Sequence, residues 1–415
     1  MMGMNPFLEK PMDLNKSFKD WRSIYPQPYN KYEVDPYTKT RIILMNGTEF
    51  EANWFSHQFS RHCTDNDLRR EIALTRRIEQ QQQKVISLLK PANESILEHT
   101  ISYEQLAVDL TALLAQREPN GYVKAALNFA LLEDFDHLYR YADLLEMEYG
   151  IQAEHLVGHY TEIMPGRPTI SEHRYPIDNI RKFIDFDTAD PITKLNISII
   201  TAAEQQTMNY YMNLADFYCS DLGRQLYQEI GLIEEQHVSQ YESLKDTRLT
   251  WLENLLLHEY TECYLYYSCF EDETDCYIKK IWEEHLEQEI AHLHKAAQLL
   301  ERFEGKCWQQ VIPNGCFPEL LQFKPNKAYI REVMQNTITL TSVKEGYVEP
   351  CQLAHDDPFF KFQETLNHQV CSVPSHKTIE KIINEKGIDY RFEVAPHPVP
   401  SLQNRTCDNV CIGVI

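Results

Sequence analysis

Apolar residues recur at three- and four-residue steps between residues 193 and 304, which predicts amphipathic α-helices. Acidic residues and histidines interrupt these apolar stripes. One stripe reads Leu252, Leu255, Leu256, Glu259, Cys263, Tyr266 and Phe270, and the next reads Ile278, Trp282, His285, Glu289, His292, Leu293 and Ala296. A carboxylate in a buried stripe is strongly destabilising unless a proton or a cation neutralises it. The pattern therefore predicts helices that turn acidic side chains toward a bound cation.

Three segments share one spacing, in which a glutamate is followed thirty positions later by an acidic residue and three positions further by a histidine. They are Glu104, Asp134 and His137; Glu204, Glu234 and His237; and Glu259, Glu289 and His292. The midpoint of each segment falls in a run that does not continue a helix, such as Pro119-Asn120-Gly121. Equal residue counts on both sides of the turn place the three side chains at one height, about 22 Å from the loop. Each segment therefore predicts a helical hairpin.

Two such hairpins that face each other supply four carboxylates and two imidazoles, enough for a dinuclear metal site in a helical bundle. An acid and a histidine three positions apart lie on one helix face and reach the same ion. Oxygen and nitrogen ligands suit iron or manganese, and the sequence leaves the choice between them open. Glu262 lies off this spacing, and we expect it to contribute little.

The second and third hairpins form the predicted site, with the ligands Glu204, Glu234, His237, Glu259, Glu289 and His292. The first hairpin carries Glu104, Asp134 and His137, and its shorter aspartate reaches less far. It is either a second metal half-site or a structural hairpin that has kept the pattern.

The order Glu204, Glu234-x-x-His237, Glu259, Glu289-x-x-His292 resembles the ferritin-like di-iron carboxylate superfamily, and within it the rubrerythrin-like branch. The resemblance covers residues 195–303, with a partial echo over 102–148. It implies that Glu234 and Glu289 bridge two iron ions, that Glu204 and Glu259 are terminal ligands, and that each histidine caps one metal. It also implies redox chemistry with dioxygen or peroxide, which includes peroxide reduction, Fe(II) oxidation and oxygenation of a small organic substrate.

Two features depart from that superfamily. Only a short stretch separates Glu234 from Glu259, so either the bundle runs up-down-up-down with a link near Lys245, or hairpins pair between chains. The chain also has no Cys-x-x-Cys pair, so we expect an external electron-donor protein. The alternative function is non-catalytic, either iron binding and storage or a structural role in an assembly, and we expect a homo-oligomer.

The predicted fold is mainly α, with a ferritin-like four-helix bundle after a helical hairpin block. The predicted regions are an irregular extension over 1–64 with a β-hairpin around Asn46-Gly47, a helical block over 65–163 with a degenerate ferritin-like hairpin, a linker over 164–192, the metal-binding bundle over 193–304, and a mixed C-terminal extension of unknown role over 305–415. The C-terminal region includes a strand-like run at 337–343 and a helix around 376–385.

Charge and cysteine content restrict the partners and the compartment. Forty basic and 62 acidic residues give a net charge of -22, which argues against nucleic acids and anionic membranes as partners. No apolar run approaches the length needed to span a bilayer. The 11 cysteines are an odd number and are scattered along the chain, which is typical of reduced thiols. We therefore expect a cytoplasmic protein.

Overall fold

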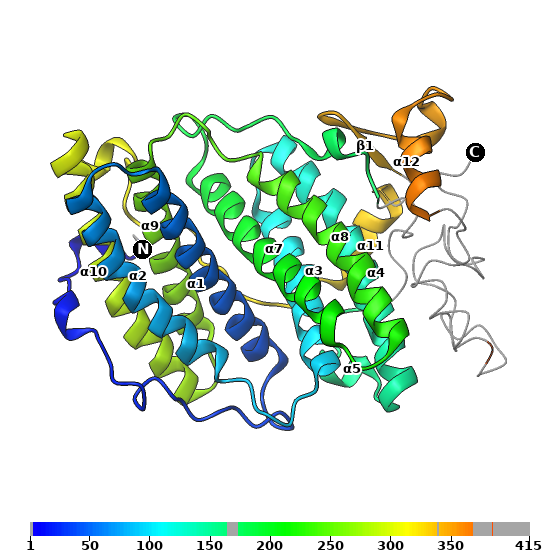
Figure 1. Ribbon diagram of the computed structural model, residues 1–415, viewed down its shortest axis with the longest axis horizontal. Coiled ribbons are helices and arrows are strands. Elements are labelled where there is room, and N and C mark those ends of the chain that lie inside the picture. The colour runs from blue at the N-terminus through cyan, green and yellow to red at the C-terminus, as the bar shows by residue number, and fades with distance from the viewer. Residues whose placement is uncertain (1–2, 164–172, 338–339, 368–383, 385–415) are drawn as a thin grey trace. The chain divides into compact units, whose positions relative to one another are not determined.

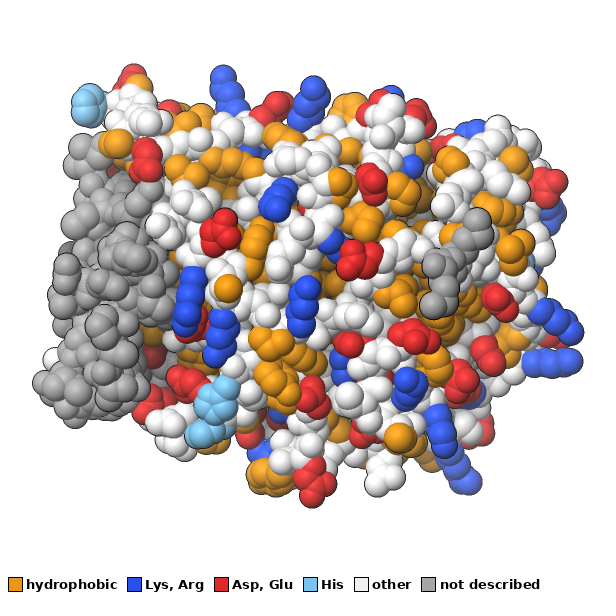
Figure 2. All heavy atoms as spheres, turned by 180° about the vertical axis from the view of Figure 1, so that it is seen from behind, with side chains coloured by type: hydrophobic (Ala, Val, Ile, Leu, Met, Phe, Trp, Pro, Cys, Tyr) orange, Lys and Arg blue, Asp and Glu red, His pale blue; other side chains and the backbone are white. Residues whose placement is uncertain are grey.

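The computed structural model describes residues 3–163, 173–337, 340–367 and 384. These residues are mainly helical (Figure 1), which confirms the predicted mainly α class. None of the helices in this described part combines the length and apolar character that crossing a lipid bilayer requires. On the face shown in Figure 2, acidic, basic and apolar side chains are interspersed. Several other acidic side chains lie in the interior, where they form the candidate centres discussed below.

Eight long helices in the described residues form four hairpins. They are α1 (Pro36–His62) and α2 (Asn66–Ser87), α3 (Ile96–Arg117) and α4 (Gly121–Tyr149), α7 (Pro191–Phe217) and α8 (Asp221–Glu242), and α9 (Trp251–Asp272) and α10 (Cys276–Glu304). Each second helix begins after a polar N-cap whose side chain accepts hydrogen bonds from first-turn N–H groups; these caps are Asp65, Asn120, Ser220 and Asp275. The caps fix where each hairpin turns, and so fix the height of every side chain along it.

The eight helices form a tandem repeat. The helices α1 to α4 have 27, 22, 22 and 29 residues, and α7 to α10 have the same four lengths. Each helix begins 155 positions after its counterpart, as Pro36 and Pro191 illustrate. Details of the caps repeat as well, because α4 and α10 both end at a left-handed glycine, Gly150 and Gly305.

The described residues divide into two compact units. Unit 1 lies within Met1–Glu94, Ile184–Ala203 and Asp246–Phe323, and unit 2 within Ser95–Phe183, Glu204–Lys245 and Lys324–Ile415. In unit 1 the hairpin α1–α2 packs on α9–α10. In unit 2 the hairpin α3–α4 is joined by α8 and by α7 from Glu204 onward. Each unit therefore takes one hairpin from each repeat, except that the first part of α7, up to Ala203, belongs to unit 1.

This division differs from the predicted regions. The predicted bundle over 193–304 is not one unit, because α8 belongs to unit 2 and α9 to unit 1. The short link near Lys245 therefore leads from one unit to the other. The predicted blocks 1–64 and 65–163 are likewise divided, because unit 1 continues to Glu94 and unit 2 begins at Ser95.

The β-hairpin predicted around Asn46-Gly47 is wrong, because α1 runs through this segment. Asp35 caps the helix, Pro36 occupies its first turn, and the run Ile42–Met45 is buried on all sides. Asn-Gly favours a tight turn only as a local preference, and burial of the surrounding apolar run against neighbouring helices outweighs it.

Shorter elements complete the fold. They are α5 (Ala153–Leu156), α11 (Lys327–Thr337), α12 (Pro358–Asn367), the antiparallel strands β1 (Thr341–Val343) and β2 (Gly346–Val348), and 3-10 turns at Pro6–Leu8, Leu14–Lys16, Pro176–Asn179, Trp308–Gln310 and Pro350–Gln352. Strand β1 lies at the end of the strand-like run predicted at 337–343, and β2 follows that run. The helix predicted around 376–385 falls almost wholly outside the described residues.

Candidate metal centres

Six buried side chains meet in unit 2, at one level along four helices. They are Glu104 on α3, Asp134 and His137 on α4, Glu204 on α7, and Glu234 and His237 on α8. Each is at most 1% exposed. We call this set centre 2. The first hairpin, for which a half-site and a structural role were both open, thus supplies half of a six-residue cluster.

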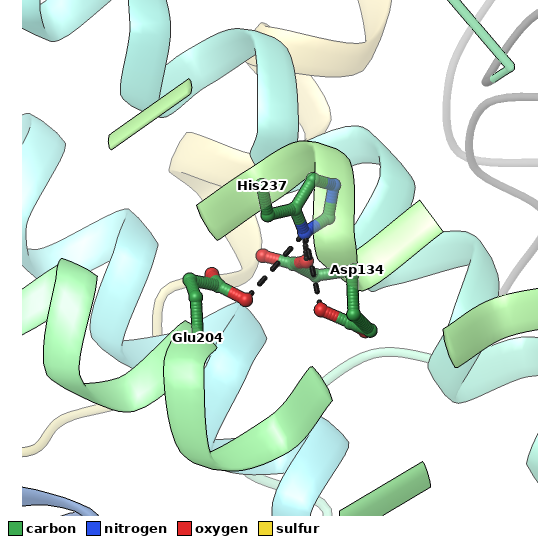
Figure 3. Close-up of side chains that lie close together, drawn as sticks. Asp134, Glu204 and His237 are labelled. Carbon is green, nitrogen blue, oxygen red and sulfur yellow. Dashed lines mark ion pairs between the residues drawn. The ribbon is translucent and has the colours of Figure 1, made fainter. Parts of the chain in front are cut away.

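One imidazole nitrogen of centre 2 faces three carboxylates (Figure 3). His237 Nδ1 lies 3.1 Å from Asp134 Oδ1, 3.2 Å from Glu234 Oε2 and 3.5 Å from Glu204 Oε2. Two donor atoms bound to one ion at about 2.1 Å lie about 3.0 Å apart at a right angle and about 4.2 Å apart when opposite. These separations suit four ligands of a single ion.

Glu234 also belongs to a second cluster. Its Oε1 lies 3.0 Å from His137 Nδ1, and Glu104 completes this group. Each oxygen of Glu234 therefore faces a different imidazole. Such sharing is the arrangement that a carboxylate bridge between two ions requires.

Two further residues orient His237. Its Nε2 lies 2.7 Å from Glu133 Oε2, and the other oxygen of Glu133 accepts a hydrogen bond from Arg174. Arg174 Nε also donates to Asn179 at 2.7 Å. Because a carboxylate only accepts, Nε2 carries a hydrogen, which leaves Nδ1, the nitrogen that faces the three carboxylates, as the one available to a metal ion. A carboxylate behind the imidazole is a common outer shell of metal sites.

Burial leaves the polar atoms of centre 2 without enough hydrogen-bond donors. Both oxygens of Glu204, Glu104 Oε2, Asp134 Oδ1 and His237 Nδ1 are buried and make no hydrogen bond. Burial, reinforced by the charge of Asp134, raises the pKa of Glu204 well above its usual range. Burial also acts to raise the pKa of Glu234, but the two imidazoles outweigh it and leave that pKa lowered. The buried carboxylates of centre 2 therefore lack the positive charge that would balance them, and two bound metal ions would supply it.

Aromatic side chains close one side of centre 2. Tyr211 donates a hydrogen bond to Glu104 Oε1 at 2.6 Å, and its ring packs against Tyr141 and Tyr227. All three tyrosines are fully buried. They separate the carboxylates from bulk water on this side and fix the position of Glu104.

Unit 1 contains a related cluster, centre 1. Its members are Glu49 on α1, Glu79 and Gln82 on α2, Glu259 and Glu262 on α9, and Glu289 and His292 on α10. Glu49, Glu79 and Gln82 repeat the hairpin spacing, with glutamine in the histidine position. The predicted site is thus divided, because Glu204, Glu234 and His237 lie in unit 2, whereas Glu259, Glu289 and His292 lie in unit 1.

The geometry of centre 1 differs from that of centre 2. His292 Nδ1 lies 3.1 Å from Glu289 Oε2, 3.8 Å from Glu259 Oε2 and 4.0 Å from Glu79 Oε1. The Gln82 amide donates to Glu289 Oε1, and Tyr266 donates to Glu49.

Several residues of these centres do not fit the pattern from which the ligands were predicted. Glu49, Glu79 and Gln82 have glutamine in place of histidine, although an offset of 155 residues aligns them with Glu204, Glu234 and His237. Glu262 was set aside, yet it is fully buried and clusters with Glu259 and Glu289. No spacing signal marks Arg174, which lies outside the repeat.

Comparison of the chain with protein-family models, with curated proteins and with solved structures found no match.

Proposed function

We propose that centre 2 binds two iron ions, or manganese in their place, and that the chain is a non-haem dimetal carboxylate protein of the ferritin-like kind. The observation that carries this proposal is the sharing of Glu234 between two clusters, each with its own imidazole nitrogen. Asp134, Glu204, Glu234 and His237 would hold one ion, and Glu104, His137 and Glu234 would hold the other. In place of Glu259, Glu289 and His292, which the resemblance implied, the first hairpin would supply the remaining ligands.

A pair of Fe(II) ions supplies two electrons to dioxygen or peroxide, and we propose such redox chemistry for centre 2. The protein's part is to hold the ligands in place. Glu133 and Arg174 keep the hydrogen of His237 on Nε2, and Tyr211 holds Glu104. Repeated turnover would need an external electron donor, and the net charge of -22 favours a basic one.

Metal binding is the first test. In a titration with Fe(II) under nitrogen, Glu234→Ala should bind two fewer ions per chain than wild type. Glu235→Ala is the matched control, because Glu235 is the next residue, is exposed and accepts a hydrogen bond from Ser239 on the same helix. Equal iron content in wild type and Glu234→Ala would refute the assignment of centre 2.

Peroxide consumption with an artificial reductant separates catalysis from storage. If the enzyme proposal holds, wild type consumes peroxide many times faster than Glu234→Ala, and Glu235→Ala matches wild type. Equal slow consumption by iron-loaded wild type and Glu234→Ala would leave the non-catalytic iron-binding alternative in place of peroxide reduction.

A further inference from the structure

We propose that centre 1 is a second metal site that holds a single divalent ion, bound by Glu79, Glu259 and His292. This proposal concerns unit 1 and does not depend on the chemistry proposed for centre 2. It follows from aligning the two centres through the 155-residue repeat, which pairs each ligand of one centre with a residue of the other.

One of the two ion positions is present in centre 1. Glu79, Glu259 and His292 correspond to Glu234, Glu104 and His137, the second cluster of centre 2, and all three place donor atoms close together. The Oε2 atoms of Glu79 and Glu259 are buried and make no hydrogen bond, and Glu259 Oε2 lies 3.8 Å from His292 Nδ1. These two carboxylate oxygens lie in the cluster and lack the cation that would balance them.

The other ion position is closed by substitutions. Gln82 replaces His237, and its amide N–H donates to Glu289, the counterpart of Asp134. The lone pair of an amide nitrogen is delocalised into the carbonyl, so the NH2 group donates hydrogen bonds and does not bind a metal. Here it donates to a carboxylate oxygen that an ion would need.

Two more side chains complete the closure. Tyr266 donates to Glu49, the counterpart of Glu204, whereas the residue that corresponds to Tyr266 in centre 2 is the shorter Thr111. Gln288 stands where Glu133 orients His237. The histidine and its outer carboxylate have thus both become amides, and the change removes one ion position together with its support.

Glu262 adds a carboxylate that centre 2 lacks, since its counterpart is Ala107. It clusters with Glu259 and Glu289, without an imidazole. His258 lies between Glu262 and Glu51, at 3.4 Å and 3.0 Å. The His258 imidazole therefore lies within ion-pair distance of Glu262, so a neighbouring side chain rather than a second ion serves that carboxylate.

Ion counting with Mn(II) tests the proposal on the full chain, by equilibrium dialysis without oxygen followed by elemental analysis. Wild type should bind three ions per chain, and His292→Ala should bind two. Glu259→Gln keeps the side-chain volume and should also bind two. Glu234→Ala should bind one, which reports centre 2 separately.

The outcomes separate the two centres. Two ions in wild type, unchanged by His292→Ala and Glu259→Gln, would overturn the site in centre 1 and leave centre 2 standing. Four ions in wild type, or a loss of one ion in Glu262→Gln, would overturn the single-ion assignment. If wild type binds only one ion, and His292→Ala removes that ion, two-ion binding at centre 2 is refuted.

A gain of binding tests why only one ion is held. The triple variant Gln82→His, Gln288→Glu, Tyr266→Phe restores the histidine and its outer carboxylate and removes the donor to Glu49. We expect a fourth Mn(II) ion. A folded triple variant that still binds three ions would overturn the conclusion that these three side chains close the position.

Discussion

Replacement of Glu133 by glutamine should weaken metal binding at centre 2 without removing any ligand. Glu133 accepts from His237 Nε2 at 2.7 Å and is the buried partner of Arg174. An amide at this place can present its N–H to the imidazole, which would move the ring hydrogen to Nδ1, where the ion must bind. Loss of an outer-shell partner weakens metal binding about 10- to 100-fold, or about 1.4 to 2.7 kcal/mol.

The same change has a second effect, which does not involve metal. It removes the charge of the carboxylate that pairs with the buried Arg174 guanidinium, and breaking a buried ion pair costs about 3 to 5 kcal/mol of folding free energy. This loss of folding free energy should be the same in metal-free and metal-bound protein. Weaker metal binding should appear separately, because Mn(II) should then raise the free energy of unfolding by less than it does in wild type.

Urea unfolding with and without Mn(II), together with competition against a chelator of known affinity, measures both effects. Glu235→Gln is the matched control, because it removes one exposed carboxylate on α8 and should change neither quantity. If Glu133→Gln binds Mn(II) within about threefold of wild type, the argument from the ring hydrogen of His237 is wrong.

Three further changes test the fold. Burial lowers the pKa of His285 to about 3. Between pH 6.5 and 3 the unfolded state therefore binds one more proton than the folded state, and the wild type loses stability as the pH falls. In urea unfolding over that range, His285→Gln should lose less stability than wild type. A Cβ at Gly223 would lie 2.2 Å from a tyrosine ring, so Gly223→Ala should cost about 1 to 3 kcal/mol, whereas Gly121→Ala has open space and should not destabilise; equal melting temperatures would contradict this. Arg41 donates to buried Glu273 at 2.9 Å, and Arg41→Met should cost about 3 to 5 kcal/mol, so a loss below about 1 kcal/mol in denaturant would refute the importance of this pair.

The sequence was sufficient for the long helices of three hairpins and for the height of their ligands, because helical periodicity and residue counts are local properties. It was insufficient for hairpin pairing. Every hairpin presents its acids at the same height, so any two would appear complementary. Pairing depends on contacts far apart in the chain, such as Arg41 with Glu273, whose counterparts in the other unit are Asn196 and Glu118.

The missed helix α1 and the missed half of centre 1 share one cause. Asn46-Gly47 predicted a turn inside α1, and Gln82 broke the histidine pattern, although Glu49 and Glu79 kept the spacing of the other hairpins. Internal repetition is a signal of longer range than either, and it would have restored both.

The exchange of hairpins between the repeats has a consequence for dividing the chain. A break anywhere between Gly150 and Pro191 yields one fragment with α1 to α4 and another with α7 to α10, yet neither fragment contains all ligands of either centre. Each fragment would expose two half-lined surfaces, and metal binding would return only on mixing. The protein is therefore suited to split-fragment complementation, with reassembly reported by the metals themselves.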